Sequence, residues 1–238
     1  MRFVAVLQGH AHVLQWVSEC FVGERLRITE LGERWVLESP EFNSCTDPQE
    51  VFPIADALVS KIHRILALYC ELHTPLTVNS IQGIDPEGRP CKSSIRLTAS
   101  VEICSSKGIA ELSGLKSDRS FGVEVFELAL SDPAVMEALN LRGEKPAGWS
   151  YIYDVIEFCG GVEAARVLGS TTRKRVSEIK QTANHYRHLG SPKNYPLPAA
   201  PISSDEAASF ARDLLRKWIL LRLTENRESH EASNRAES

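Results

Sequence analysis

The 238-residue sequence lacks the short motifs that mark the commonest classes of enzyme. It contains no GxGxxG or GxxxxGKS/T glycine-rich loop, no GxSxG nucleophile motif and no HExxH zinc motif. Nucleotide hydrolysis and serine-hydrolase chemistry therefore have no support from motifs. Enzymes that carry no short motif are not excluded by these absences.

Long apolar runs and paired cysteines are also missing. No stretch of 18 apolar residues could cross a membrane, and the first residues hold a single Arg without the long apolar segment of a signal peptide. The six cysteines are scattered, with no CxxC pair, so we expect reduced and mostly buried thiols rather than a disulfide framework. These features predict a cytoplasmic protein with no membrane partner.

Histidines are few, and only His10 and His12 stand at a spacing that suits the binding of one metal ion. No third or fourth ligand follows at a recognisable spacing, and the chain lacks the eight βα repeats of barrel metalloenzymes. We therefore expect these two histidines to be ordinary hairpin residues. We predict neither a metal nor a cofactor.

The first 126 residues combine β-rich segments with one long amphipathic helix. Between Ser94 and Ile103 apolar residues alternate with polar ones, which is typical of a strand with one buried face. A helix pattern begins after Asp47 and continues to residue 72, with Pro53 expected to reset or kink it. Further strands are expected at 2–8, 12–17, 26–29, 34–38 and 76–84. This order predicts an α+β fold in which a mostly antiparallel sheet packs against one main helix.

The second part of the chain shows helical patterns only. Helices are expected at 132–141, 149–158, 162–168, 170–190 and from residue 203, where Ser203 and Glu206 form the SxxE capping box. The segment 142–148, RGEKPAG, has the composition of a linker. We therefore predict an α/β domain at 1–141, an all-α bundle at 149–223 and a disordered polar tail at 224–238.

Positive charge is concentrated in the helix predicted at 170–190, which Ser170 or Thr171 is expected to cap. Arg173, Lys180 and Arg187 recur every seven residues, within about 40° of one another around the helix, and Asn184 lies beside them. From residue 166 to 193 there are seven Lys or Arg and one acid, a net charge of about +6. We call Arg173, Lys180, Asn184 and Arg187 the basic ridge. Such a ridge is suited to phosphates.

Other interpretations of this helix stay open. The basic ridge also matches an ordinary solvated helix face, or a binding site for an acidic protein. His185 and His188 are suited to general acid–base chemistry near neutral pH, and Lys180 or Arg187 to a phosphate, which suffices for a metal-independent ribonuclease. Equally, Arg187 and His188 suit the C-terminal turn of a helix because of its dipole.

Several segments follow one another in a characteristic order: RWVLESPEF, a single helix, a strand region, IYDVIE, TANHYRH, a Pro-rich connector and EAASFARDLLRKWI. In this order the chain resembles a family of uncharacterised bacterial two-domain proteins, which implies an α/β domain and a helical domain but no activity. Residues 149–223 are also similar to HEPN helical modules, which are often ribonucleases of toxin and antiviral systems. That similarity rests on Asn184, Arg187 and His188, and Lys180 precedes His185 where the HEPN motif has Arg.

The sequence thus favours a cytoplasmic binding protein, rather than an enzyme, whose basic ridge contacts RNA or DNA. A metal-independent, HEPN-like ribonuclease that uses His185 and His188 is the first alternative. The second is a protein-interaction or antitoxin-like module, which would bind a protein partner or a second copy of the chain.

Overall fold

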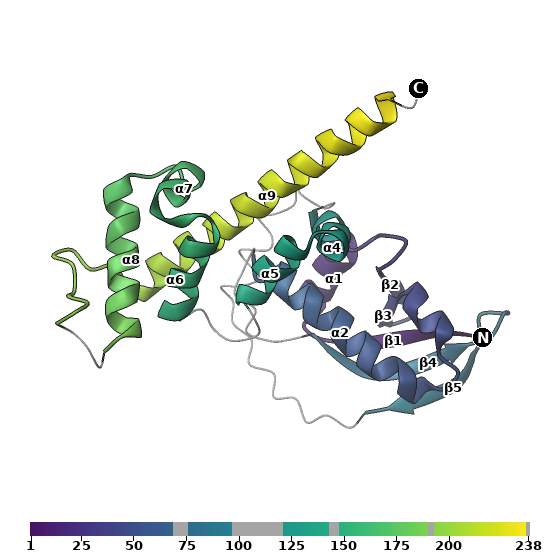
Figure 1. The fold of residues 1–238 in the computed structure, drawn as a ribbon. Helices are drawn as coiled ribbons and strands as arrows, with labels where there is room; N and C mark the ends of the chain where they lie inside the picture. Colours follow the sequence, from purple (N-terminus) through teal and green to yellow (C-terminus); the bar gives the residue numbers. More distant parts are fainter. Residues whose placement is uncertain (69–75, 97–120, 143–147, 190–192, 237–238) are drawn as a thin grey trace. The chain divides into compact units, whose positions relative to one another are not determined.

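The computed structural model describes residues 1–68, 76–96, 121–142, 148–189 and 193–236 (Figure 1). It is an α+β protein in which an N-terminal antiparallel sheet is followed by helices, and this confirms the predicted fold class. The chain forms two compact units, Met1–Glu127 and Leu128–Ser238. The division falls within helix α4 (Phe121–Ser131), whereas the sequence placed a linker at 142–148, of which 143–147 lie outside the described residues.

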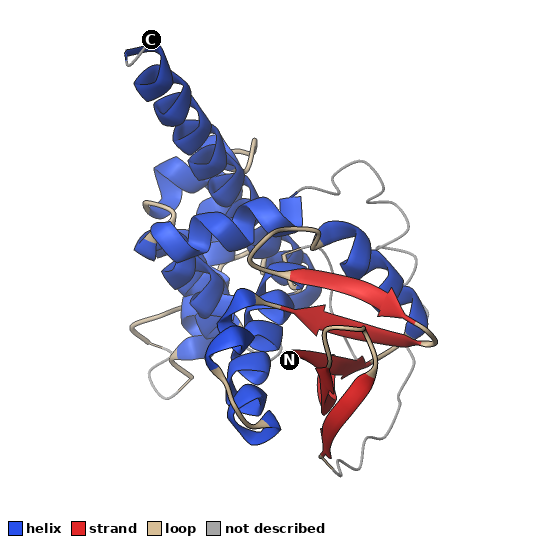
Figure 2. Ribbon diagram, turned by 90° about the vertical axis from the view of Figure 1, so that its right-hand side faces the viewer, coloured by secondary structure: helices blue, strands red, loops and turns tan. Residues whose placement is uncertain are grey.

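The sheet has the strand order β2-β3-β1-β4-β5, and each neighbouring pair is antiparallel (Figure 2). Its strands are β1 (Arg2–Gln8), β2 (Arg27–Leu31), β3 (Arg34–Glu38), β4 (Thr77–Ile84) and β5 (Pro90–Ile95). Residues 3–7 of β1 are all buried, so both faces of this central strand are excluded from water. This explains why β1 is an uninterrupted apolar run rather than an alternating one.

Strands β2 and β3 follow the prediction of strands at 26–29 and 34–38, whereas β5 begins four residues before the strand predicted from Ser94. The β2–β3 turn contains Gly32 with a φ of +65°, a conformation that glycine adopts without strain. In the β4–β5 turn, the Asp85 carboxylate accepts a hydrogen bond from the Arg89 backbone N–H at 2.7 Å. Strand β5 ends at Ile95, and the rest of the strand predicted at 94–103 lies, from residue 97, outside the described residues.

The segment expected as a strand at 12–17 is instead helix α1 (Ala11–Cys20). Its buried residues Val13, Leu14, Val17 and Cys20 are spaced as on one face of a helix, but so short an apolar run fits a strand equally well. His10 and His12 therefore lie at the start of a helix and not in a hairpin, and their rings stack with centroids 5.4 Å apart. A short 3-10 helix, η1 (Pro40–Ser44), follows β3.

The main helix of the first unit is α2 (Pro48–Leu66), which packs against β4, β1 and β5. Asp47 and Glu50 form a complete capping box at its start. The helix continues through Pro53, because buried Phe52 and Ala55 hold the chain against the sheet on both sides of the proline. It ends at Leu66, six residues before the predicted end at 72.

The second unit consists, in its described residues, of helices and the segments that connect them. After α4 it contains α5 (Pro133–Arg142), α6 (Trp149–Phe158), α7 (Gly161–Leu168), α8 (Arg173–Arg187) and α9 (Ser204–Ala236). Gly160 and Gly161 have φ angles of +95° and +78°, which allow the abrupt turn between α6 and α7. None of the helices in the described part of the chain is long and apolar enough to cross a membrane.

The core of the helical unit lies where α6 and α9 pack together and α8 packs on α6. Thr182 of α8 is fully buried, and its hydroxyl donates to the Glu178 carbonyl at 2.7 Å. The same oxygen accepts from the Ile202 backbone N–H at 3.5 Å. The connector before α9 is therefore fixed to α8, and Ile202 itself is buried.

Helix α9 continues to Ala236, where the sequence predicted a disordered tail from residue 224. Its first half buries a stripe that includes Ala207, Ala211 and Leu214, so the helix is already nucleated when the chain reaches the polar segment. Residues 224–238 contain four Glu, two Arg and two Ala, which are good helix formers, and extending an existing helix requires no new nucleus.

Candidate functional site

The basic ridge lies on α8 (Arg173–Arg187), which is shorter than the helix predicted at 170–190 and is capped one residue after Thr171. Thr172 caps this helix, with its hydroxyl oxygen accepting from the Arg175 backbone N–H at 3.1 Å. Val176, Ile179 and Ala183 are buried and form the apolar face of the helix. The ridge residues Lys180, Asn184 and Arg187 follow at helical spacing on a neighbouring side.

Two cations of the ridge are paired with acids from α6. The Lys180 Nζ lies 2.6 Å from the Glu157 carboxylate, and an Arg187 guanidinium nitrogen lies 3.3 Å from the Asp154 carboxylate. The Lys180 and Arg187 side chains are 27% and 34% exposed, so both ion pairs stand at the edge of the helix interface and in partial contact with water. α6 and α8 run antiparallel here, because Asp154 meets the end of α8 and Glu157 its middle.

Tyr153 of α6 lies against both of these cations. The Lys180 Nζ is 5.3 Å from the centre of the tyrosine ring, and the Arg187 Cζ is 4.6 Å from it. Both distances are within the range of cation–π attraction. We call Tyr153, Asp154 and Glu157 of α6, together with Lys180, Asn184 and Arg187 of α8, the α6–α8 face.

Further aromatic rings border the α6–α8 face. Trp149, the first residue of α6, stacks on Tyr186 with ring centroids 4.9 Å apart and 17° between the ring planes. Tyr186 continues the helical spacing of the buried residues Val176, Ile179 and Ala183, but it is 39% exposed. His188 stacks on Tyr195 of the connector at 4.4 Å and 20°. Planar side chains are thus grouped at the end of α8.

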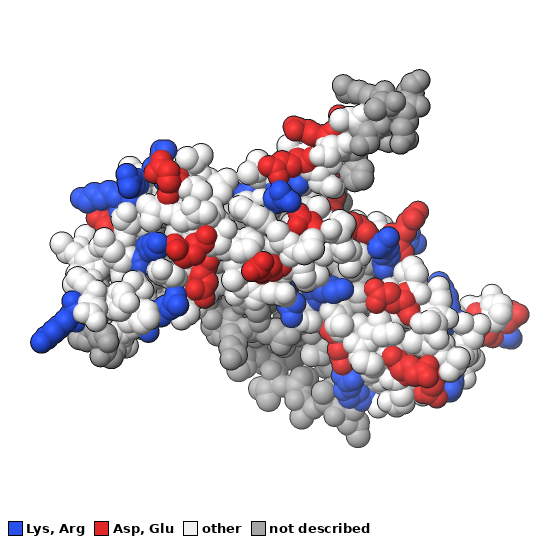
Figure 3. All heavy atoms as spheres, in the orientation of Figure 1, with Lys and Arg blue, Asp and Glu red and all other residues white. Residues whose placement is uncertain are grey.

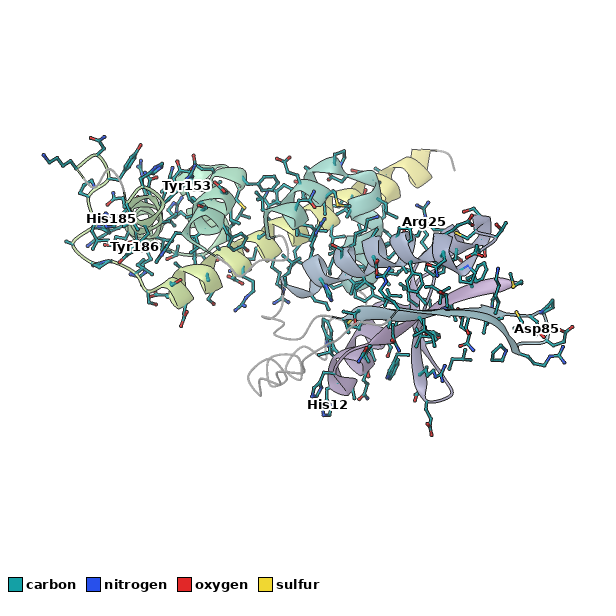
Figure 4. All side chains as sticks on the ribbon, turned by 90° about the horizontal axis from the view of Figure 1, so that it is seen from below. His12, Arg25, Asp85, Tyr153, His185 and Tyr186 are labelled. Atoms are coloured by element: carbon teal, nitrogen blue, oxygen red, sulfur yellow. The ribbon has the colours of Figure 1, made fainter. Side chains whose placement is uncertain are left out.

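The candidate catalytic residue His185 lies apart from the cations that were predicted to hold a phosphate. His185 Nδ1 is 2.8 Å from the Tyr195 carbonyl oxygen, which only accepts, so the proton of the neutral ring is on Nδ1. His185 and Arg187 are two residues apart, about 200° around the helix. Figure 4 looks along α8 and shows His185 and Tyr153 on different sides of it. The structure therefore does not bring His185 together with Lys180 and Arg187, and His188 is engaged with Tyr195.

Arg173, the first cation of the ridge, is exposed in the first turn of α8. It lies close enough to α7 for its charge to act on Glu163. The pKa of Glu163 is below its ordinary value chiefly because Arg166 donates hydrogen bonds to it, and the charges of Arg166 and Arg173 add to this. Arg175, the next cation but one, pairs with Glu206 of α9, whose hydrogen bond raises the pKa of Arg175.

Acids from neighbouring helices therefore offset the charge that the sequence places on α8. The net charge of residues 166–193 is about +6. Cations of this segment pair with Asp154, Glu157, Glu163 and Glu206, four acids that lie outside it in the chain. Figure 3 shows Lys and Arg interspersed with Asp and Glu over the helical unit. The α6–α8 face is accordingly a mixed surface of cations, acids and aromatic rings, and not a uniformly positive stripe.

Other places in the described structure offer less chemistry. Within the described ranges no three His, Cys, Asp or Glu side chains are grouped so that they would hold a metal ion. Burial raises the pKa of the Cys159 thiol to about 12, so it is a packed core residue and not a nucleophile. An open groove of about 530 Å³ in the first unit is lined by neutral and apolar side chains such as Trp35, Asn79 and Ile95, beside Glu33 and Arg34.

Comparisons with protein-family models, with curated proteins and with solved structures give no match to this chain. The resemblances drawn from the sequence, to a bacterial two-domain family and to HEPN modules, therefore stay predictions.

Proposed function

We propose that this protein binds single-stranded RNA through the α6–α8 face. The observation that carries the proposal is the position of Tyr153, whose ring lies within cation–π distance of the charged ends of both Lys180 and Arg187. Proteins that bind single strands combine cations for the phosphates with aromatic rings on which the bases stack. The α6–α8 face and the exposed Tyr186 beside it offer both kinds of group within two helices.

The existing ion pairs are compatible with such a ligand. Partly exposed pairs between Lys or Arg and a carboxylate contribute only about 0–1 kcal/mol. A phosphate can therefore replace the carboxylate on Lys180 or Arg187 at small cost, and Arg187 has the planar fork that suits a phosphate.

Binding without cleavage is the form of the proposal that the geometry favours. A metal-independent ribonuclease needs an acid–base group within hydrogen-bond reach of the same phosphate that the cations hold. His185 lies about 200° around α8 from Arg187, so a phosphate held by Arg187 is on another side of the helix from His185.

A reducing, cytoplasmic setting is part of the same proposal. In the described part of the chain Cys45, Cys91 and Cys159 are thiols outside any disulfide, which fits a compartment that keeps cysteines reduced.

The proposal is tested with the full chain and a fluorescently labelled 12-nucleotide RNA, by anisotropy at several salt concentrations in EDTA. Lys180→Gln with Arg187→Gln should weaken binding roughly tenfold and lower the slope of log affinity against log salt by about two, because two phosphate contacts are lost. Arg166→Gln with Lys217→Gln is the matched control, since these cations pair within their own helices.

Three outcomes distinguish the functional hypotheses. A salt-sensitive loss in the first double variant but not in the control supports the proposal. Equal affinity in both variants contradicts it. Shortened RNA would instead support the ribonuclease, and His185→Ala and His188→Ala would then identify the acid–base group.

A further inference from the structure

The acids of the α6–α8 face have no role in the proposed function, although they make the closest contacts on it. Glu157 approaches the Lys180 Nζ to 2.6 Å, and Asp154 approaches Arg187 to 3.3 Å. A phosphate oxygen that bound Lys180 or Arg187 would take a position like the one each carboxylate oxygen now holds, because both ligands accept hydrogen bonds at similar distances. The ligand and the two acids therefore compete for the same donors.

We infer that Asp154 and Glu157 act as internal substitutes for two phosphates, so that they hold the site closed in the free protein and set its affinity for RNA. This inference rests on the proposed function. It assigns each acid to one phosphate position, with Glu157 marking the position at Lys180 and Asp154 marking the one at Arg187. Tyr153, which lies within cation–π distance of both cations, marks the position of a base.

The partial exposure of the two acids makes the exchange of carboxylate for phosphate reversible. The Asp154 and Glu157 side chains are 47% and 44% exposed, so each carboxylate can turn into water when a phosphate displaces it. No charge is then left buried without a partner, which would be the expensive step. The two acids lie one turn apart on α6, and both face α8.

The competition predicts which ligands open the site. A single inorganic phosphate replaces one carboxylate and gains little free energy of binding, because one charge-assisted hydrogen bond is exchanged for another. A short RNA strand offers two phosphates and a base for Tyr153 together, so it alone gains stacking in addition to the exchange. We therefore expect inorganic phosphate to compete poorly with RNA at this site.

The test removes the acids and leaves every cation in place. In the full chain, Asp154→Asn with Glu157→Gln should bind the 12-nucleotide RNA about two- to tenfold more tightly than the unchanged protein, because two competing pairs are lost. The slope of log affinity against log salt should become steeper, because no carboxylate is released to take up a cation when the phosphate binds. The control variant, Asp213→Asn with Glu225→Gln, removes two acids from ion pairs on α9. It should leave the RNA affinity and the salt slope unchanged.

The outcomes separate this inference from the proposed function. Tighter binding and a steeper slope in the first variant alone support the inference. If the unchanged protein binds RNA and the first variant binds it equally, the inference is wrong and the proposed function stands. If the control variant gains the same affinity for RNA, the effect comes from net charge and the inference is also wrong. If no variant binds RNA at low salt, both are wrong, provided that circular dichroism shows each variant to be folded.

Discussion

At the scale of single residues, Tyr153 connects the two parts of the candidate site. It belongs to α6, yet its ring contacts the charged ends of two residues of α8. The sequence could predict the cations, because they repeat every seven residues along one helix. It could not predict Tyr153, Asp154 and Glu157 as their partners, because these lie more than 20 residues earlier and only the packing of α6 on α8 brings them close.

Replacing Tyr153 separates stacking from charge. Tyr153→Ala should weaken RNA binding by roughly 1–3 kcal/mol, the contribution of one stacked base, whereas Tyr153→Phe should keep most of the affinity. Anisotropy with the same RNA measures both, and thermal unfolding shows whether the helix interface survives. Equal loss in Phe and Ala would mean that the hydroxyl matters and the ring does not, contrary to the proposal.

At the scale of elements, ion pairs and caps position the helices of the second unit. Asp132 caps α5 by accepting from the Ala134 backbone N–H at 2.9 Å, and its other oxygen accepts two hydrogen bonds from Arg222 of α9. Burial alone raises the pKa of Asp132, but the hydrogen bonds from Arg222 and Ala134 and the charge of Arg222 bring it below its ordinary value of 3.8. Asp132 therefore fastens the start of α5 to the middle of α9.

This contact makes the helical unit sensitive to acid. A carboxylate whose pKa is lower in the folded state stabilises the fold above its unfolded pKa of about 3.9, and that contribution is lost as the pH falls through the lowered folded value. Asp132→Asn should therefore unfold at lower urea than the unchanged protein at pH 7, with the difference shrinking below about pH 4. Circular dichroism at pH 7, 4 and 3 measures this, with Asp213→Asn as a control. A difference that is the same at every pH would exclude ionised Asp132 as the cause.

The helices and strands also show which parts of the fold can be predicted from local sequence patterns. The strands β2 and β3, the start of α2 after Asp47 and the helices α6 and α7 were predicted from residues that interact within a few positions. α1 was predicted as a strand because its apolar run is short, and α4 was not predicted because Val123 and Val125 favour strands. Helix α9 is longer than predicted because its buried first half supports the polar segment after it.

At the scale of the whole molecule, charge is divided unevenly along the chain. Residues 1–148 contain six more acids than cations, and residues 149–238 contain two more cations than acids. This pattern predicted two parts and placed the polyanion surface in the second. The structure confirms a sheet followed by helices, but it places the division at Glu127 and Leu128, inside a helix that no composition shift marks.

The central claim is that RNA contacts the α6–α8 face, and one measurement addresses it directly. The full chain is cross-linked by ultraviolet light to RNA that carries 4-thiouridine, and the modified peptides are located by mass spectrometry. We predict cross-links at Trp149, Tyr153 or Tyr186, and their loss when excess unlabelled RNA is added. Cross-links confined to residues 1–127, or none above a control without light, would contradict the account.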